Sequence, residues 1–393
     1  MVGKLLNVAT GALWTLGFVV CSPLNASLPG YSTVLSSRSE QAALKSALSI
    51  HPNSGELLDI AVRSSPVDTS VEIEKIDPKR QREAPILWSQ AEEAPFAQGS
   101  NSLSDTSIVL ERERFGGIMQ TAIAHSLSQR PLGNIVQAIA HQLLGSTYQP
   151  NLLDRFHQES LIVSLSQFDC VLFVETVLAI AKGVAVQDYS YKTFTNHLQD
   201  QRYRDGKLNG YCSRLHYFSE WIANNQQRGN VLNLTLELGG VSRRKPLNFM
   251  SDHRNSYPRL VSDNATYQCI RRMEANLDPF TLSYIPTERI HQIYSRLRPG
   301  DIVAIATDIP GLDVTHTGLV YRTGNGGIGL IHAAPNSGVK ISPDLQAYVS
   351  RVDDAIGILV ARSADPRVRM SLQPLQTGRL FSQFHHSPGS GTL

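Results

Sequence analysis

The sequence predicts an α+β fold, in which helices form the first half of the folded region and an antiparallel sheet forms the second half. Between residues 115 and 183, apolar residues recur at helical spacing or fill a run of helix length. From residue 297 onward they form short runs bounded by Gly, Pro, Asp and Asn, which are typical of strands. We therefore expect one folded domain over residues 108–362.

The composition excludes several classes of protein. The chain has 393 residues, of which 41% are hydrophobic and 18% charged, so a large core can form. The net charge of +2 gives no electrostatic footprint for nucleic acid. Four cysteines without a CxxC motif disfavour a zinc ribbon or a thioredoxin-type site. We expect neither a cofactor nor a metal ion.

The two ends of the chain read as segments outside the domain. Residues 1–26 resemble an export signal, with Lys4 before an apolar run and Ala26 as a small residue for cleavage. Cleavage, retention as a membrane anchor and lipidation at Cys21 all stay open, and each places the domain in the periplasm or cell envelope. Residues 27–107 are expected to be a disordered linker containing Ser and Pro, and residues 363–393 a flexible tail.

Helices are expected at residues 115–128 and 134–144, the second capped by Asn134. The run CVLFVETVLAIAK, residues 170–182, is apolar on nearly every face and predicts a buried helix. Asp169 is a good cap for it, so Cys170 falls in the first turn.

Strands are expected within residues 297–308, 316–323, 327–334 and 355–363. The dipeptide Asn325-Gly326 indicates a hairpin turn between the second and third of these. His316 and His332 lie on the two strands of that hairpin, where adjacent side chains can meet.

These placements predict a nucleophile, a base and an orienting group. A helix N-terminus lowers the pKa of a cysteine thiol, which favours Cys170 as nucleophile, with His316 as base and His332 as the group that orients it. Each residue alone is more often an ordinary core residue. A metal site formed by the two histidines with Asp308 or Asp313 is the competing use, but no clear third ligand completes it.

The number of cysteines bears on the same point. If Cys21 leaves with the export signal, Cys170, Cys212 and Cys269 remain, and an odd number in an exported protein indicates a free thiol. Cys212 and Cys269 could pair and leave Cys170 free, or both could stay reduced.

A second group of residues is a candidate for substrate recognition. Arg214, His216 and Tyr217 lie close together in residues 211–221, where an Arg fork suits a carboxylate and an aromatic face suits a sugar ring. A packed amphipathic helix is the alternative. Asp169 is a further candidate contact, although a helix cap is its ordinary role.

Five segments that follow one another along the chain together resemble one known family. The sequence of residues 112–362 resembles the DUF1460 family, which is N-acetylmuramoyl-L-alanine amidase-like, within the NlpC/P60 cysteine peptidase superfamily. Leu172 and Thr317 depart modestly from that pattern. The segments that carry the resemblance are AIAHQLLGSTYQ, FDCVLFVETVLAIA, YRDGKLNGYCSRLHYFSEWI, GDIVAIATDIPGLDVTHTGLVYR and GLIHAA.

The resemblance implies a papain-like fold and a Cys-His-His triad of Cys170, His316 and His332. It also implies cleavage between N-acetylmuramic acid, in its 1,6-anhydro form, and the L-Ala of the stem peptide in small peptidoglycan fragments. A γ-D-Glu-diaminopimelate endopeptidase and a catalytically silent wall-binding protein are the alternatives. We expect a monomer, tethered to a membrane only if the N-terminal segment is retained.

Overall fold

The computed structural model describes residues 105–277 and 280–371. The expected export signal, the expected linker up to residue 104 and most of the expected tail lie outside these residues, whereas residues 105–107 of that linker begin a helix. The helices are α1 (Asp105–Ala124), α2 (Leu132–Gln142), α3 (Cys170–Ala185), α4 (Tyr191–Arg202), α5 (Phe218–Gln227), α6 (Phe249–Asp252), α7 (Pro258–Ser262), α8 (Asn264–Leu277), α9 (Leu345–Val349) and α10 (Pro366–Ser371). None of the described helices is long and apolar enough to cross a bilayer.

The strands form two sheets. A parallel pair joins β1 (Thr147–Tyr148) to β2 (Gln167–Phe168). The large sheet is antiparallel and runs β4-β5-β10-β6-β7-β8-β9, with β3 paired to β10. Its members are β3 (Val231–Asn233), β4 (Val241–Arg244), β5 (Thr281–Pro286), β6 (Ile302–Thr307), β7 (Val314–Arg322), β8 (Ile328–Ala334), β9 (Gly338–Ser342) and β10 (Ala355–Ser363). The predicted α+β class is thus confirmed.

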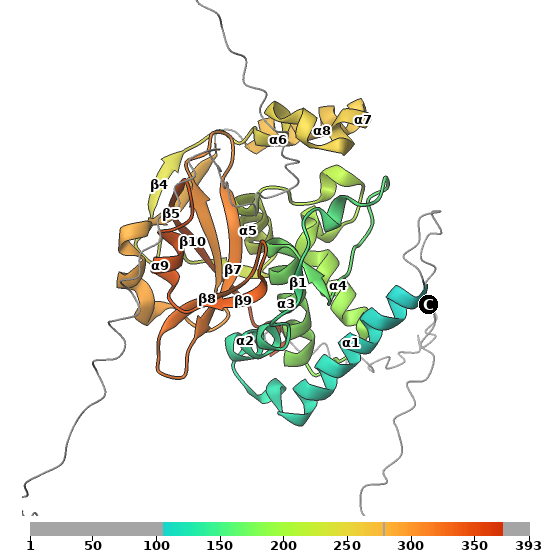
Figure 1. The fold of residues 1–393 in the computed structure, drawn as a ribbon, viewed down its shortest axis with the longest axis vertical. Coiled ribbons are helices and arrows are strands. Elements are labelled where there is room, and N and C mark those ends of the chain that lie inside the picture. Colours follow the sequence, from blue (N-terminus) through green and yellow to red (C-terminus); the bar gives the residue numbers. More distant parts are fainter. Residues whose placement is uncertain (1–104, 278–279, 372–393) are drawn as a thin grey trace, which may run out of the picture. The chain divides into compact units, whose positions relative to one another are not determined.

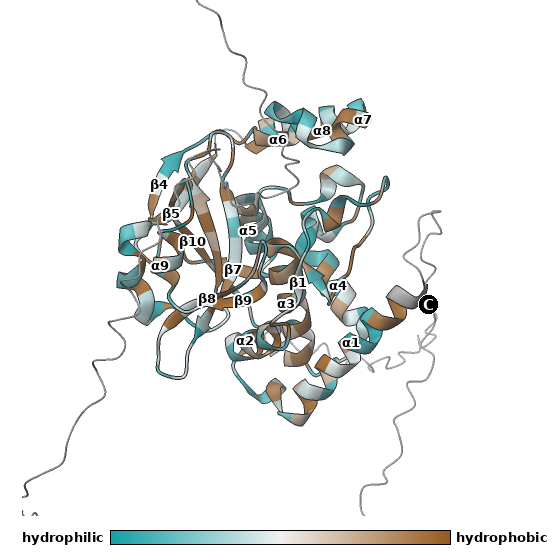
Figure 2. Ribbon diagram, viewed as in Figure 1, coloured by the Kyte–Doolittle hydropathy of each residue, from teal (hydrophilic) through white to brown (hydrophobic). Residues whose placement is uncertain are grey.

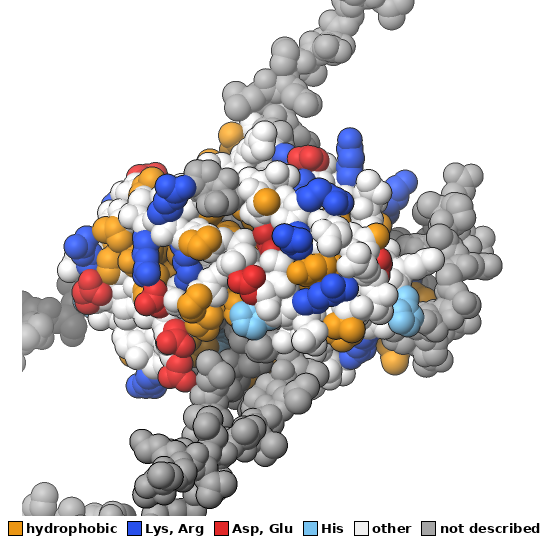
Figure 3. All heavy atoms as spheres, turned by 90° about the horizontal axis from the view of Figure 1, so that it is seen from above, with side chains coloured by type: hydrophobic (Ala, Val, Ile, Leu, Met, Phe, Trp, Pro, Cys, Tyr) orange, Lys and Arg blue, Asp and Glu red, His pale blue; other side chains and the backbone are white. Residues whose placement is uncertain are grey.

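Helices cover one face of the large sheet, where α3 packs directly against β7 and β8, and α9 lies on the other side (Figure 1). Every residue of α3 except Val171 is buried, as its uniformly apolar sequence predicts. Helix α3 stands out as hydrophobic in Figure 2, while β4 at the sheet edge is hydrophilic. On the surface seen in Figure 3, acidic and basic side chains are interspersed.

Several helix boundaries differ from the prediction. The first helix begins at Asp105 rather than at 115, the second ends at Gln142 rather than at 144, and the third ends at Ala185 rather than at 182. The first helix ends at Ala124 rather than 128, because Ser126 takes a left-handed backbone conformation, with φ 49°, that a helix cannot continue. The second begins at Leu132 after Pro131, so Asn134 lies inside the helix and does not cap it. Proline is favoured just before or at the start of a helix, because it lacks the N–H that would stay unpaired there.

The region after residue 362 also differs in part from the expected tail. Strand β10 extends to Ser363, and α10 follows it. The Arg367 guanidinium donates from Nη1 to the carbonyl of Ser128 at 2.7 Å and pairs with Asp365 at 2.5 Å. These contacts hold the beginning of the expected tail against the domain.

Candidate active site

Cys170 begins α3, as predicted. The Asp169 carboxylate accepts a hydrogen bond from the Leu172 amide at 2.7 Å and so caps this helix. Burial raises the pKa of Asp169 to about 6, although the amide hydrogen bond opposes that rise. Cys170 is fully buried at this helix end. The sequence alone therefore located both the helix start and its cap.

The two histidines are brought together as expected. His316 lies in β7 and His332 in β8, and His316 Nε2 lies 2.6 Å from His332 Nδ1. Their rings are nearly perpendicular, with centroids 4.8 Å apart. The close approach depends on Gly318, since a Cβ there would come within 2.9 Å of the His332 Cβ.

This histidine pair (His316 and His332) is neutral. Burial and then the charge of Lys340 lower the pKa of His316 to about 3. Burial, His316 and Lys340 lower the pKa of His332 to about 2. Both rings are neutral at pH 7, so each carries a single N–H. One of the two facing nitrogens therefore donates the hydrogen bond through its N–H, and the other accepts that hydrogen bond.

A pocket lies beside Cys170 at the start of α3, and we call it the helix-end pocket. Asp169, Arg214 and His216, all expected to bind substrate, are among its lining residues. Tyr217 is not among them, because its buried hydroxyl donates to Glu274 at 2.7 Å. The helix-end pocket is lined by Leu153, Asp169, Cys170, Val171, Glu175, Arg202, Arg214, Leu215 and His216.

Buried ion pairs surround the helix-end pocket. Arg202 Nε donates to Glu175 at 2.6 Å, and both side chains are almost fully buried. Arg214 donates to Asp154 at 2.7 Å and lies 3.5 Å from Glu159. Burial raises the pKa of Asp154 to about 6 in spite of its pairing with Arg214. These side chains come from elements up to about sixty residues apart, so sequence reasoning missed Arg202 and both carboxylate partners of Arg214.

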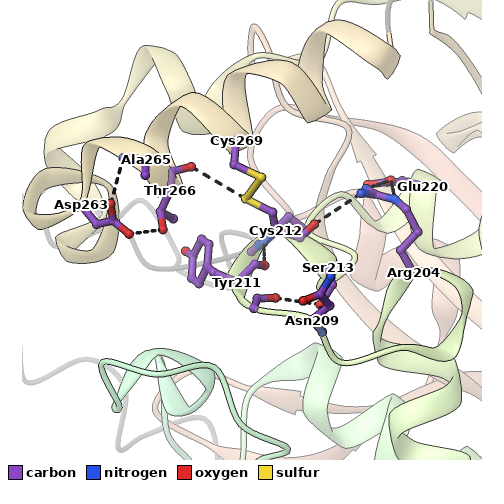
Figure 4. The surroundings of a disulfide bond; sticks show 12 residues. Arg204, Asn209, Tyr211, Cys212, Ser213, Glu220, Asp263, Ala265, Thr266 and Cys269 are labelled. Atoms are coloured by element: carbon purple, nitrogen blue, oxygen red, sulfur yellow. Dashed lines mark hydrogen bonds and ion pairs between the residues drawn. A yellow bond between two sulfur atoms is a disulfide. The ribbon is translucent and has the colours of Figure 1, made fainter.

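A disulfide ties the neighbouring loop to α8. Cys212 and Cys269 are bonded, with their Cα atoms 6.2 Å apart, which resolves the pairing that the sequence left open (Figure 4). The short turn Tyr211–Ser213 therefore has a covalent anchor just before Arg214 and His216. The carbonyl of Tyr211 also lies 2.8 Å from His216 Nε2.

The state of Cys170 differs from the expected free thiol. Cys170 is disulfide-bonded in this structure, and none of the described cysteines is free. Cys170 makes no hydrogen bond to His316 or His332 within the described part of the chain. Leu319 and Ile331, which alternate with the histidines along β7 and β8, belong to the core that includes α3. The structure thus joins His316 and His332 on the side of the sheet that faces α9 and does not bring Cys170 to them.

A metal site is the competing use of the histidines. Across residues 105–277 and 280–371, no group of three or more His, Cys, Asp or Glu side chains is placed to hold a metal ion. Asp313 instead accepts hydrogen bonds from the amide and hydroxyl of Ser219 at 2.7 and 2.5 Å. Asp308 pairs with Arg243 at 2.6 Å on the surface.

Comparisons with solved structures find similar folds. An N-acetylmuramoyl-L-alanine amidase from Bacteroides uniformis ATCC 8492 is 29% identical, with a TM-score of 0.56, over 59% of this chain and 99% of the other. A proposed xylanase from Bacteroides fragilis is 30% identical, with a TM-score of 0.51, over 57% and 98%. A DUF1460 protein from Legionella pneumophila str. Philadelphia 1 shares the fold at 19% identity and a TM-score of 0.50, over 66% and 97%.

The family comparison identifies the domain more directly. No curated protein matches the chain significantly. A family model described as AmiA-like, N-acetylmuramoyl-L-alanine amidase-like, matches residues 138–358. That match covers more than half of the chain and spans the helix-end pocket and the histidine pair. The protein is therefore a member of the N-acetylmuramoyl-L-alanine amidase-like family of cell-wall hydrolases.

Proposed function

We propose that this protein is a cysteine amidase that cleaves the bond between N-acetylmuramic acid and the L-Ala of the stem peptide. The observation that carries the proposal is the hydrogen bond between His316 and His332, inside the region that matches the amidase family. The solved neighbours carry names for two different bonds, an amide and a glycosidic bond. The family match favours the amide.

The chemistry requires the reduced form of Cys170. Its thiolate attacks the lactyl carbonyl carbon, and the oxyanion is stabilised by backbone N–H groups at the start of α3. The carbon–nitrogen bond then breaks as His316 gives a proton to the departing L-Ala nitrogen. Water, deprotonated by His316, cleaves the thioester and releases the muramic acid carboxylate together with the thiol.

The nitrogens of His316 have separate roles in this mechanism. Nε2 is hydrogen-bonded to His332, which leaves Nδ1 to exchange a proton with Cys170 and the substrate, a step that requires the reduced thiol to reach the face of the sheet on which His316 lies. A thiolate at Cys170 would favour the imidazolium form of His316 and oppose the pKa decrease that burial causes. Arg214, His216 and Asp169 line the helix-end pocket and are proposed to hold the stem peptide.

The reaction is proposed to take place in the periplasm or cell envelope. Its proposed substrates are small anhydro-muropeptides, and the proposed fold is the papain-like NlpC/P60 fold. An endopeptidase that cuts between D-Glu and diaminopimelate would use the same groups on a peptide without the sugar. A silent wall-binding protein would need none of the three residues.

Mass spectrometry of a disaccharide-anhydro tetrapeptide tests the proposal. The full-length chain, treated with a mild thiol reductant, should release free tetrapeptide, and Cys170→Ala should lower kcat/KM by at least about 10⁴-fold. A Cys212→Ser/Cys269→Ser variant controls for reduction of the second disulfide. A sugar bearing a dipeptide would instead move the cleaved bond to D-Glu.

The link between Cys170 and His316 needs its own measurement. If His316 activates the thiol, iodoacetamide should alkylate reduced Cys170 faster at pH 7 in the unaltered protein than in His316→Ala. Equal rates in the two proteins, or an inert Cys170, would leave the wall-binding role as the better account.

A further inference from the structure

A third side chain extends the histidine pair. His332 Nε2 lies 3.0 Å from the hydroxyl oxygen of Ser342, the last residue of β9. Strand β9 pairs with β8, and the residues opposite His332 and Leu330 are Lys340 and Ser342. Three successive strands therefore supply a hydrogen-bonded row of His316, His332 and Ser342.

We propose that Ser342 is a positioning residue, which holds His332 in the one tautomer that lets His316 act as a base. The inference rests on the proposed function, because it assigns a role within that catalytic machinery. Ser342 itself touches neither the nucleophile nor the substrate in this assignment.

A serine hydroxyl can donate or accept, and the proposal assigns Ser342 the acceptor role toward His332. A neutral imidazole has one N–H and one acceptor nitrogen. If His332 donates from Nε2 to the Ser342 hydroxyl, its Nδ1 accepts from the Nε2–H of His316. His316 then has its lone pair on Nδ1, the nitrogen that must take the thiol proton. The opposite tautomer of His332 would place the proton of His316 on Nδ1 and block that step.

The backbone around Ser342 keeps its hydroxyl in place. A Cβ at Gly329 would collide with the carbonyl oxygen of Ser342, so only glycine lets the end of β9 lie this close to β8. Pro343 follows Ser342 directly. The Tyr348 ring of α9 packs against His332, with centroids 4.5 Å apart, and limits rotation of the imidazole.

The charged and titratable neighbours support a neutral row. Lys340 from β9 stands opposite His332, and Tyr348 comes from α9. The positive charge of Lys340 disfavours protonation of either ring. Because both histidines stay neutral, their tautomers rather than their charge decide which nitrogen is the base.

Nitrogen-15 NMR of the histidine rings tests this directly in the full-length chain. The unaltered protein should show His332 protonated on Nε2, assigned by comparison with His332→Gln. Ser342→Ala should shift part of the population to Nδ1, whereas Ser342→Thr, which keeps the hydroxyl, should restore the original tautomer. Ser350→Ala is the matched control, because among the described residues the hydroxyl of Ser350, which follows α9, donates only to the carbonyl of Gln346, at 2.9 Å.

Kinetics gives the second measurement. Ser342→Ala should lower kcat about 10- to 100-fold with KM unchanged, the usual effect of losing an orienting partner, and Ser342→Thr should recover most of it. An unchanged His332 tautomer in Ser342→Ala would overturn the proposal. So would a kcat in Ser342→Ala equal to that of an active unaltered enzyme. If the unaltered enzyme releases no tetrapeptide, the proposed amidase function fails, and the NMR result still decides the role of Ser342.

Discussion

The helix-end pocket and the histidine pair are both buried, yet they handle charge in opposite ways. Around the pocket, Glu175 with Arg202 and Asp154 with Arg214 form buried ion pairs. Across β7 and β8, two imidazoles share one hydrogen bond, and burial holds their pKa values far below the ordinary range.

The difference follows from the side chains available. An arginine keeps its charge in any protein environment, so burying it requires a carboxylate partner. A histidine can lose its proton at little cost near pH 7, so it becomes neutral when buried. We call the ion pairs around the helix-end pocket the charged region and the histidine pair the neutral region. In the proposed mechanism the charged region recognises the substrate, and the neutral region transfers protons.

The largest expected effect comes from breaking an ion pair of the charged region. Arg202→Met leaves Glu175 buried without its cation and should lower the free energy of unfolding by about 3–5 kcal/mol. Denaturant unfolding would measure this loss, and adding Glu175→Gln should recover much of it. His332→Gln, which leaves no buried charge, should cost clearly less. Equal losses for Arg202→Met and His332→Gln would remove the contrast between the two regions.

A smaller effect is expected from the disulfide beside the helix-end pocket. Replacing Cys212 and Cys269 by serine opens a loop with a sequence separation of 57 and should lower the free energy of unfolding by about 2–4 kcal/mol. Because the turn at residues 211–213 leads into Arg214, KM should rise more than kcat falls. A change in kcat alone would show that this loop serves the histidine pair instead.

Local sequence patterns predicted the parts of the fold that depend on neighbouring residues. The apolar run after Asp169 and the hairpin turn at Asn325-Gly326 gave α3 and the β7–β8 hairpin, and with them the meeting of His316 and His332. Strand β4, with the sequence VSRR, has no apolar alternation and is held by its pairing with β5, so no local pattern revealed it.

Long-range partners of the candidate site could not be predicted in the same way. Glu175 pairs with Arg202, which lies 27 residues away on α4 and carries no distinguishing pattern. Ser342 is likewise an ordinary serine until β9 is paired with β8. Such contacts depend on the tertiary arrangement, which one sequence does not specify residue by residue.

The smallest expected effect concerns the pH dependence of the charged region. The pKa of Asp169 is about 6 in the folded protein against an ordinary value of 3.8, because burial disfavours the charged form of the carboxyl. A raised pKa means that the folded state holds the proton more tightly. The contribution of this group to stability is therefore complete below about pH 4, declines as the pH rises through 6, and then stays constant.

Asp169→Asn should remove that decline, since an amide oxygen can still cap α3 but carries no charge. Two pKa units correspond to about 3 kcal/mol, so the difference in unfolding free energy between pH 4 and pH 7 should shrink by at most that amount. Asp154, with the same raised pKa, should leave part of the slope in place.

Asp188→Asn is the matched control for that measurement. Asp188 accepts hydrogen bonds at the start of α4 from the Ser190 amide at 3.0 Å and the Thr193 hydroxyl at 2.5 Å, and these lower its pKa. Its contribution is present above pH 4 and lost as the pH falls, which is opposite to that of Asp169. Slopes that change in the same direction in both variants would show that burial does not set the titration of the charged region.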